Sequence, residues 1–299
     1  MSAPLPVDVV VVTWNSREMV LGCLRSLNAS LVQTITVVDN GSTDGTAAAV
    51  REHDPAPDLV RLEETLSLAA AYNRGADHGS AELVLFLNDD ILASDAALVT
   101  LAEALLGQPD AAAAAGRLVD PATHETQRQY QPRPFPTWGT FARPFLGIDR
   151  QAPVLDEETT VAVDQPPGAS LLVRRGVFQA IGGWDEQFEF WYEDVDLARR
   201  LGEHGPVLYV PTAPFEHVGG FSARRLDRSE LVSRHYRGAL LYASKHFGAP
   251  QRVAAGLLYS LVAAARIGLS RRDRKARAAY SSVLSSGLRL AAGRRLSRP

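Results

Sequence analysis

Cysteine is almost absent from this 299-residue sequence, and its single residue, Cys23, cannot form a disulfide within the chain. A chain without disulfides suits a reducing compartment. Cys23 lies in an apolar helical pattern, which predicts a buried small side chain. The sequence also lacks an uninterrupted apolar run of about 18 residues, so we expect no membrane-spanning helix. No basic segment followed by an apolar run opens the chain, so we expect no signal peptide and a cytoplasmic protein.

Negative charge is scarce at the end of the chain. From residue 251 onward there are ten Arg and one Lys but a single acid, Asp273, so this stretch carries +10. The formal net charge of the whole chain is −3, which leaves −13 for residues 1–250. The asymmetry predicts an acidic catalytic body and a basic tail that meets an anionic surface. Nucleic acid is not the expected partner, because the tail lacks interleaved aromatic residues.

The first part of the sequence alternates apolar strands with short helices. Residues Val7 to Thr13 form a continuous β-branched run, which indicates a strand buried on both faces. Asn15 and Glu18 predict a capping box for the helix that follows it. Further strands are expected at 34–39, 60–62 and 82–87, and helices at 17–27, 46–53, 68–79 and 95–106. This order predicts a parallel, doubly wound α/β sheet.

The later part of the sequence is less regular. Residues 120–167 are rich in Pro, Gln, Arg and aromatics and predict a long loop region over a site. Beyond it we expect strands at 169–173 and 207–210 and helices near 176–181 and at 193–202, 229–247 and 252–296. The apolar stretch 253–269 and the basic run 271–277 are typical of a segment that lies on a membrane surface. A packed helical hairpin or a dimer contact is the alternative.

Three polar clusters follow predicted strands, namely Thr13-Trp14-Asn15, Asp39-Asn40-Gly41 and Asn88-Asp89-Asp90. Because ligands bind beyond the carboxyl ends of strands in open α/β sheets, we expect the clusters to share one site. A nicotinamide-binding protein would have a Gly-x-Gly-x-x-Gly turn after the first strand, which is missing here. The first two clusters therefore predict a nucleotide held by side chains, with Asp39 accepting hydrogen bonds from a base or ribose. A plain turn is the alternative for Asp39.

The adjacent acids Asp89 and Asp90 would repel a diphosphate but can hold it through a divalent cation, since Mg²⁺ typically uses one or two carboxylates plus substrate phosphates. Such a cation would also stabilise a departing nucleoside diphosphate. The alternative is that both acids simply belong to the start of a helix or to a turn. His217 is a candidate metal ligand as a neutral imidazole, with a purely structural histidine as the alternative.

A second carboxylate pair, Glu193-Asp194, lies among aromatic residues between Trp191 and Leu197. Burial and mutual repulsion can tune such a pair into a general base that takes a proton from an attacking hydroxyl. Both acids also stand at the start of a predicted helix, so a favourable interaction with the helix dipole is the alternative. That structural role fits Asp196 better than a catalytic one.

Taken in order, these motifs resemble the family 2 glycosyltransferases, particularly the rhamnosyltransferase-like branch. The matching segments are 9–16 (VVVVTWNS), 37–46 (VVDNGSTDGT), 71–75 (AYNRG), 86–91 (FLNDDI), 182–201 and 217–222. The resemblance implies a GT-A fold, a Rossmann-like and mostly parallel sheet flanked by helices. It implies a glycosyltransferase domain over 1–228, with a nucleotide half of about 1–115 and an acceptor half of about 116–228. Residues 229–299 would form a helical basic extension.

The resemblance also implies roles for individual residues. Asp90 and His217 would bind Mg²⁺ or Mn²⁺, and Asp194 would be the base of an inverting displacement, with Glu193 as its rival. The nucleotide would be bound by Thr13, Trp14, Asn15, Asp39, Gly41, Asn73, Arg74, Asn88 and Asp89. Gly168, Trp184 and Trp191 would contact the acceptor or the donor sugar.

The chain departs from the family pattern in two places. Asn88 replaces the first acid of the D-x-D signature, and Thr65 to Leu68 replaces an Asn-x-Gly run before AYNRG. The resemblance implies transfer of rhamnose or a similar sugar from a UDP- or dTDP-sugar to a glycan, glycolipid or small-molecule acceptor. The setting would be cell-envelope polysaccharide synthesis at the inner face of the plasma membrane, with a homodimer left open.

Other classes of protein are weighed against this one. A sugar-phosphate nucleotidyltransferase would need a Gly-rich basic loop after the first strand, which is absent. An inactive nucleotide-sugar binding protein is disfavoured by the intact acids at 89, 90, 193 and 194. A glycosyltransferase that tailors a secondary metabolite stays open.

Overall fold

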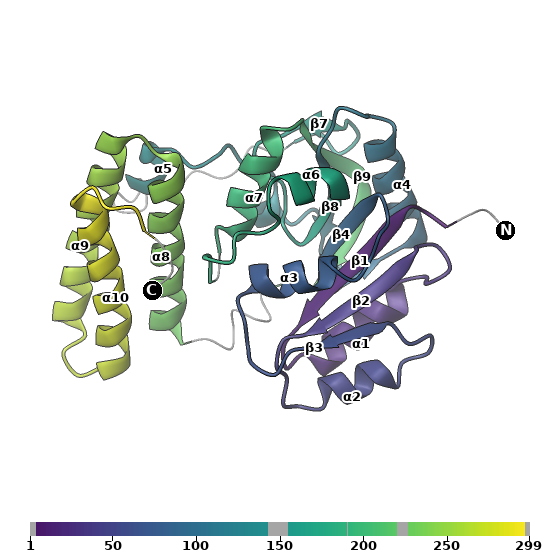
Figure 1. Ribbon diagram of the computed structural model, residues 1–299, viewed down its shortest axis with the longest axis horizontal. Coiled ribbons are helices and arrows are strands. Elements are labelled where there is room, and N and C mark those ends of the chain that lie inside the picture. Colours follow the sequence, from purple (N-terminus) through teal and green to yellow (C-terminus); the bar gives the residue numbers. More distant parts are fainter. Residues whose placement is uncertain (1–3, 143–154, 190, 220–226, 297–299) are drawn as a thin grey trace. The chain divides into compact units, whose positions relative to one another are not determined.

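The computed structural model describes residues 4–142, 155–189, 191–219 and 227–296 (Figure 1). The chain divides into two compact units, which are described separately. The first unit comprises Met1–Phe135, Gln151–Asp185 and Leu197–Gly219, and the second comprises Pro136–Arg150, Glu186–Asp196 and Gly220–Pro299.

The first unit contains one sheet, whose strands among the described residues are β1 (Val7–Thr13), β2 (Thr34–Asp39), β3 (Asp58–Arg61), β4 (Leu83–Asn88), β5 (Ile91–Ala93), β6 (Ala113–Val119), β7 (Val161–Ala162), β8 (Ser170–Arg174) and β9 (Val207–His217). Their order is β3-β2-β1-β4-β8-β6-β9-β5, with β7 beside β9. Strands β1 to β4 are parallel to one another, and β6 is parallel to β9. β8 is antiparallel to both of its neighbours.

Helices alternate with these strands along the chain. They are α1 (Arg17–Ser26), α2 (Thr46–Arg51), α3 (Leu68–Ala76), α4 (Asp95–Leu106), the 3₁₀ turn η1 (Arg128–Tyr130), α6 (Arg175–Ala180) and α7 (Glu193–Gly202). By the unit bounds, α7 starts in the second unit and continues in the first.

Strand β1 explains why the sheet is covered on both faces. Its residues are buried along the whole strand, and successive side chains point to opposite faces. Val9 and Val11 belong to a core that includes residues of α1 and α4, whereas Val10 and Val12 belong to a second core with residues of α3, α6 and α7. The β-branched run therefore serves two cores at once, as a central strand of a doubly wound sheet must.

The second unit is helical in its described part. It contains α5 (Trp138–Ala142), α8 (Arg228–His246), α9 (Ala249–Leu269) and α10 (Arg274–Ala291), and α10 packs against both α8 and α9. At one crossing, Gly256 and Gly287 bring the two backbones together, because a Cβ on Gly256 would lie 2.6 Å from the carbonyl oxygen of Gly287. Larger residues at these positions would force the helices apart.

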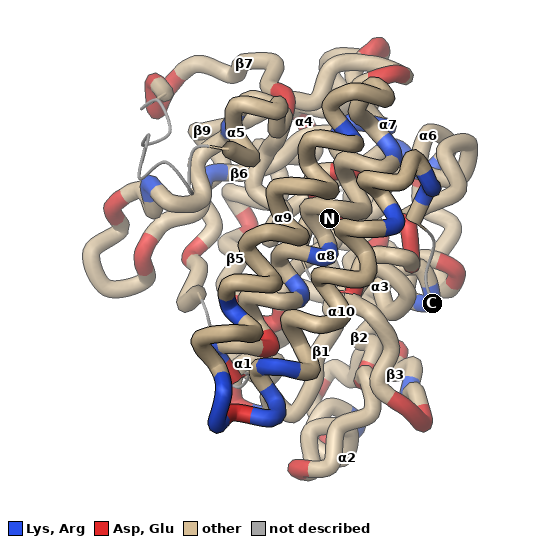
Figure 2. Tube along the Cα trace, turned by 90° about the vertical axis from the view of Figure 1, so that its left-hand side faces the viewer, with Lys and Arg blue, Asp and Glu red and all other residues tan. Residues whose placement is uncertain are grey.

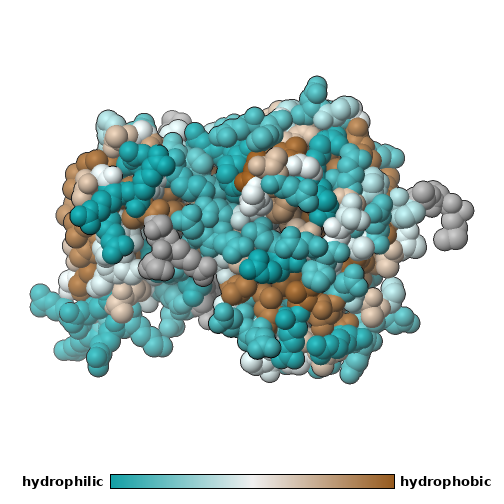
Figure 3. Space-filling model, in the orientation of Figure 1, coloured by the Kyte–Doolittle hydropathy of each residue, from teal (hydrophilic) through white to brown (hydrophobic). Residues whose placement is uncertain are grey.

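One face of α9 is apolar and exposed. Leu257, Leu261 and Leu269 are 57%, 71% and 82% exposed, and we call these three residues the α9 stripe. Figure 3 shows hydrophobic surface over α9, and Figure 2 shows Lys and Arg gathered at the turn between α9 and α10. Among the described residues, α9 is the one helix that is long and apolar enough to cross a membrane, judged by length and composition alone.

The predicted α/β fold with helical C-terminal residues is confirmed, but three strands were not predicted and one helix cap was predicted wrongly. The strands that were not predicted are β5, β6 and β7. Residues 252–296, predicted to be helical, form the two helices α9 and α10, and the Asp273 side chain accepts a hydrogen bond from the Ala276 N–H and caps α10. The capping box at Asn15 does not form, since Ser16 is the N-cap of α1 and its side chain makes no capping hydrogen bond.

Candidate functional site

The carboxyl ends of β1, β2 and β4 bring the first predicted clusters together. In the strand register Thr13 pairs with Asp39, and Val12 pairs with Asn88. Thr13, Asp39 and the following Asp89 are all buried. The three polar clusters therefore lie at one edge of the sheet, where open α/β folds bind ligands.

Asp39 offers an unused acceptor at this edge. It is fully buried, its Oδ1 accepts a hydrogen bond from the Ser42 N–H at 3.3 Å, and the Arg61 Nε lies 3.8 Å from Oδ2. Oδ2 has no hydrogen-bond partner among the described residues. A buried carboxylate oxygen without a donor carries a desolvation cost that a ligand hydroxyl or amide could offset.

The loops after β1 and β2 hold each other in place. The Asn15 N–H donates to Ser42 Oγ at 2.8 Å, and Asn15 Oδ1 accepts from the Thr43 N–H at 2.7 Å. Gly41 has φ +81°, and a Cβ there would lie 3.1 Å from the backbone nitrogen of Thr65, so the turn needs glycine. Trp14 lies beside this junction and is 36% exposed.

Asn88 and Asp89 are engaged by neighbouring side chains. Thr13 Oγ1 donates to Asp89 Oδ2 at 2.8 Å, and the Tyr72 hydroxyl donates to Asn88 Oδ1 at 3.1 Å. Both contacts fix the start of the segment that leads from β4 to β5. Cys23 is a buried thiol near this segment. Its burial and the nearby acids raise its pKa well above the usual range.

Asp90 and His217 are brought together by the pairing of β5 with β9. Both are buried, and His217 Nε2 lies 3.5 Å from Asp90 Oδ1. Asp90 Oδ2 accepts a hydrogen bond from the Gly219 N–H at 3.1 Å, whereas Oδ1 has no hydrogen-bond partner among the described residues. Burial lowers the pKa of His217, against the opposing influence of Asp90, and so favours a neutral imidazole.

Gln127 decides which nitrogen of His217 carries the proton. Its Nε2 donates to the His217 carbonyl at 2.7 Å, so its Oε1 must be the atom that faces His217 Nδ1 at 2.8 Å. An oxygen there accepts a hydrogen bond from the Nδ1–H, so the single proton of the neutral ring stays on Nδ1 and Nε2 is unprotonated. Nε2 and Asp90 Oδ1 are then two acceptors that face each other.

That arrangement fits a divalent cation. A neutral imidazole and a carboxylate are common ligands of Mn²⁺ and related ions, and an outer partner on the other ring nitrogen is typical of such histidines. Among the described residues there is no group of three or more His, Cys, Asp or Glu side chains that could hold a metal. A cation at Asp90 and His217 would therefore depend on further ligands from water or from a bound diphosphate.

Asn73 and Trp184 form a clamp between α3 and the loop before α7. Asn73 Nδ2 donates to the Trp184 carbonyl and Asn73 Oδ1 accepts from the Trp184 N–H, both at 2.9 Å. The Trp184 ring is buried and stacks on Tyr72 with centroids 5.1 Å apart. The clamp occupies the Asn73 amide, whereas the next residue, Arg74, is exposed. Gly168 is half-buried just before Ala169, whose carbonyl accepts from the Asn88 N–H.

The predicted base lies in the second unit. Glu193 is buried, and its Oε2 has no hydrogen-bond partner among the described residues. Burial, with the neighbouring Asp194 charge, raises the pKa of Glu193 to about 8. Asp194 is half-buried, its Oδ1 accepts from the Val195 N–H at 2.8 Å, and loss of water raises its pKa as well. Raised pKa values at a carboxyl pair are a mark of functional sites.

The residues before this pair are conformationally unusual. Trp191 and Tyr192 have φ of +64° and +70°, which bulky side chains rarely adopt. Trp191 is half-buried, and its ring lies 5.2 Å from His235 on α8. Backbone held in this region costs energy and often marks a site whose geometry is imposed by its surroundings.

The sequence did not reveal two sets of contacts that hold site residues in place, those of Gln127 and those of Asp196. Gln127 lay in a segment without a readable pattern. Asp196 was assigned a structural role at a helix start, but its partners on α8 were not foreseen. Its buried Oδ1 lies 2.6 Å from Lys245 Nζ and 2.7 Å from His246 Nε2. The basic last turn of α8 was the only signal for those partners.

Comparison with known proteins gives the class to which this site belongs. The sequence model of glycosyl transferase family 2 matches residues 8–174, which is more than half of the chain. The chain therefore belongs to glycosyl transferase family 2, and the predicted family is confirmed.

The relatives of the chain include two rhamnosyltransferases and a glucosyltransferase. The N-acetylglucosaminyl-diphospho-decaprenol L-rhamnosyltransferase of Mycobacterium tuberculosis is 29% identical over 80% of this chain and 85% of its own length. Rhamnosyltransferase WbbL of Escherichia coli is 26% identical over 80% of this chain and 93% of its own. The validoxylamine A glucosyltransferase of Streptomyces hygroscopicus is 28% identical over 76% of this chain and 60% of its own.

Among solved structures, the chain resembles that of GalNAc-T7 with UDP, GalNAc and Mn²⁺. The TM-score is 0.59 at 14% identity over 80% of this chain, which spans half the length of that chain. At this identity the likeness concerns the fold, and it supports the predicted GT-A type.

Proposed function

We propose that this glycosyltransferase moves rhamnose or a similar sugar from a UDP- or dTDP-sugar to an acceptor hydroxyl, with inversion at the anomeric carbon. The observation that carries the proposal is the buried Oδ1 of Asp90, which faces the unprotonated Nε2 of His217 and lacks a hydrogen-bond partner among the described residues. In this proposal the two side chains share Mg²⁺ or Mn²⁺. The glycosyltransferase domain covers residues 1–228, and its nucleotide half is about 1–115.

The donor is held at the sheet edge. We assign Asp39 Oδ2, which has no hydrogen-bond partner among the described residues, to the ribose or the base, and Trp14, which is 36% exposed, to the same nucleotide. The remaining nucleotide-binding residues of the proposal are Thr13, Asn15, Gly41, Asn73, Arg74, Asn88 and Asp89. A bound cation would neutralise negative charge on the departing diphosphate. Gly168, Trp184 and Trp191 are assigned to the sugars.

Asp194 is the proposed base, with Glu193 as the rival. Burial raises the pKa of both carboxyl groups, and Glu193 is the more deeply buried of the two, so we assign the proton of the pair at neutral pH to Glu193. Asp194 is more exposed to water than Glu193 and can reach a substrate hydroxyl. A protonated Glu193 next to it limits repulsion between the two groups.

The first experiment is calorimetric titration with UDP and dTDP, each with and without Mn²⁺ or Mg²⁺. We expect binding of one nucleotide that depends on the metal, because the acids repel a diphosphate that carries no cation. Asp90→Ala should weaken that binding about tenfold or more, since it removes a charged ligand. Glu203→Ala, an exposed acid, is the matched control and should bind like the wild type. Metal-dependent binding that is unchanged in Asp90→Ala would contradict the metal assignment.

The acceptor is proposed to be lipid-linked. The M. tuberculosis relative is named for a diphospho-decaprenol acceptor, and the α9 stripe beside a basic turn suits the surface of an anionic membrane. The enzyme would then act in cell-envelope polysaccharide synthesis, lying peripherally on the inner face of the plasma membrane.

A second candidate function is tailoring of a soluble secondary metabolite. The validoxylamine A glucosyltransferase relative favours it, since its name denotes a small-molecule acceptor. Sedimentation with anionic vesicles separates the two functions, because a chain that ignores vesicles and glycosylates soluble acceptors fits only the second.

A further inference from the structure

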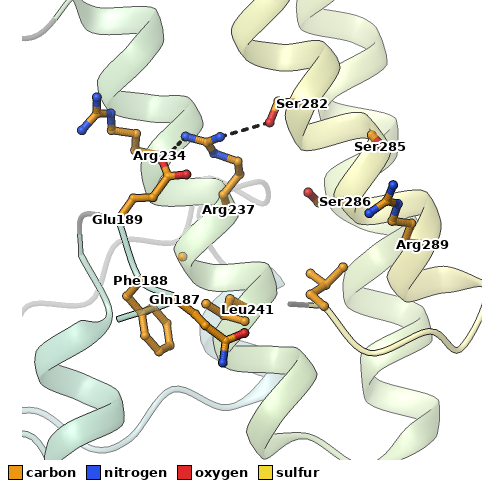
Figure 4. Close-up of a pocket in the computed structure, with 12 residues that line it drawn as sticks. Gln187, Phe188, Glu189, Arg234, Arg237, Leu241, Ser282, Ser285, Ser286 and Arg289 are labelled. Carbon is orange, nitrogen blue, oxygen red and sulfur yellow. Dashed lines mark hydrogen bonds and ion pairs between the residues drawn. The ribbon is translucent and has the colours of Figure 1, made fainter. Parts of the chain in front are cut away.

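The second unit contains a basic pocket that is lined by none of the residues assigned above to the donor, the metal or the base. Its volume is about 190 Å³, more than a single water needs. Its walls come from α8, α10, the segment before α7 and the end of the chain, and it is lined by Gln187, Phe188, Glu189, Arg234, Arg237, Gly238, Leu241, Ser282, Ser285, Ser286, Arg289 and Leu296 (Figure 4). Three guanidinium groups and three hydroxyls share this space with a single carboxylate.

Arg237 lies at the centre of the pocket. It forms an ion pair with Glu189 and donates a hydrogen bond from Nη1 to Ser282 Oγ at 3.2 Å. Its Nε is buried and has no hydrogen-bond partner among the described residues. Glu189 therefore neutralises part of one guanidinium and leaves a buried donor of that group unused, which is a cost that an added acceptor would remove.

The two other arginines leave the pocket with net positive charge. Arg234 pairs with Glu230 across one turn of α8 at 2.6 Å, and this partly exposed pair contributes little energy. Arg289 on α10 is exposed, and it has no carboxylate partner among the described residues. Of the described residues that line the pocket, Glu189 is the one acid, and it pairs with Arg237. The guanidinium of Arg289 is therefore available to an anion.

We propose that this pocket binds the phosphate or diphosphate group of the acceptor substrate, an inference that rests on the proposed function. Guanidinium groups bind phosphate oxygens with paired, charge-assisted hydrogen bonds, and serine hydroxyls add further donors. Glu189 lies a few residues before Asp194 in the chain, and both belong to the second unit. The pocket therefore anchors the charged end of an acceptor in the same unit that carries the proposed base.

The test uses the full chain and inorganic pyrophosphate, titrated calorimetrically in EDTA without divalent metal so that the donor site contributes little. We expect binding that weakens about tenfold or more in Arg289→Ala, which loses a charged donor, and in Ser285→Asp, which adds a repelling charge. Arg228→Ala is the matched control, because Arg228 is an exposed residue of α8 outside the pocket. It should bind pyrophosphate within about twofold of the wild type.

The possible sources of the diphosphate are separated by flotation with neutral phosphatidylcholine vesicles that contain a polyprenyl diphosphate. Retention that pyrophosphate competes away and that Arg289→Ala lacks assigns the pocket to a lipid-linked acceptor. Pyrophosphate binding without vesicle retention assigns it to a soluble phosphorylated acceptor. No pyrophosphate binding, or equal loss in Arg289→Ala and Arg228→Ala, would overturn the proposal.

The metal-dependent titration with UDP or dTDP is run on the same variants. We expect Arg289→Ala to bind the nucleotide as the wild type does, since this residue lies outside the donor site. If the wild type binds the nucleotide but not pyrophosphate, the proposal for the pocket fails and the proposed function stands. If the wild type does not bind the nucleotide, the proposed function itself fails.

Discussion

Glu193 and Asp194 are adjacent in the chain, but the surroundings of their carboxyl groups differ. Glu193 is buried, and its Oε2 has no hydrogen-bond partner in the part of the chain that the structure describes, whereas Asp194 is partly open to water and accepts from a backbone N–H. Environments that differ in this way assign different roles to two carboxyl groups, since one keeps its proton and the other can take one up.

The assignment of the base can be checked by amide substitutions. Asp194→Asn should lower kcat about 10²- to 10⁴-fold with donor affinity nearly unchanged, because only the proton acceptor is removed. Glu193→Gln should have a much smaller effect, since the amide resembles the protonated acid. Steady-state kinetics and nucleotide titration provide the two measurements. A larger loss of kcat in Glu193→Gln than in Asp194→Asn would reverse the roles.

The Glu193 carboxyl also makes stability depend on pH. In the folded chain Glu193 keeps its proton up to about pH 8, whereas the ordinary pKa of a glutamate is 4.5. Between these values the folded state binds more protons, so the free energy of unfolding falls as pH rises. Denaturant unfolding from pH 5 to 8 should show this fall in the wild type and in the control Glu203→Gln. In Glu193→Gln the slope should be flatter, and an identical slope would speak against a raised pKa.

For the site, the sequence predicted which residues take part better than it predicted which atoms they contact. Asp90 and His217 were paired by the family resemblance, and the register of β5 with β9 places them side by side. The proton position on His217 could not be predicted, because it depends on Gln127 from a segment without periodicity. Asn73 was expected in the nucleotide pocket, but nothing local in the sequence indicates that its amide holds the backbone of Trp184.

Among the elements, α7 and α8 are tied by the buried carboxylate of Asp196. One oxygen contacts both Lys245 and His246 at the end of α8. Asp196 is fully buried, whereas the side chain of Lys245 is 26% exposed, so the pair is only partly shielded from water. This contact holds the first turn of α7, which carries the proposed base two residues earlier.

Asp196→Asn should therefore destabilise the second unit. Removing one partner of a buried pair costs about 3–5 kcal/mol, and partial exposure of Lys245 reduces our expectation to ~2–3 kcal/mol. Asp227→Asn is the matched control, because Asp227 and Lys275 form an exposed pair at 3.6 Å. Denaturant unfolding followed by tryptophan fluorescence compares the variants. Equal midpoints for Asp196→Asn and Asp227→Asn would show that the buried contact contributes little.

Elements with strong local signals were predicted most closely. The bounds of β1 and β2 were predicted correctly because β-branched residues favour strands and both strands are largely buried. Strand β6 was missed because its sequence, AAAGRLV, has little strand preference, and it is a strand through its pairing with β8 and β9. The break between α9 and α10 lies inside a stretch that was predicted only as helical, and Asp273, a typical N-cap residue, marks it.

For the whole molecule, the charge asymmetry along the chain and the α9 stripe support the same proposal. The stripe offers apolar surface, and the exposed basic residues 271, 272, 274, 275 and 277 follow it directly. Burial of exposed leucines and attraction of basic residues to anionic lipids both favour a position in the membrane–water interface. The two contributions together give firmer binding than either alone.

Vesicle sedimentation tests this arrangement. Leu261→Asp should reduce retention on anionic vesicles several-fold, because a charge in the stripe opposes insertion. Leu288→Asp, which changes an exposed leucine of α10, is the control and should retain most binding. Raising the salt concentration should weaken binding of all variants, since attraction of the basic turn is screened. Equal retention of both variants would exclude the stripe as the contact.

The α9 stripe would also change how the enzyme finds its substrate. A protein held on a bilayer by Leu257, Leu261 and Leu269 searches for a lipid-linked acceptor by lateral diffusion in two dimensions. Confinement of both reactants to one thin layer raises their effective concentration without any new contact. The rate of sugar transfer would then follow the number of acceptor molecules per area of membrane, and dilution of the acceptor with other lipids would slow an enzyme whose bulk concentration is unchanged.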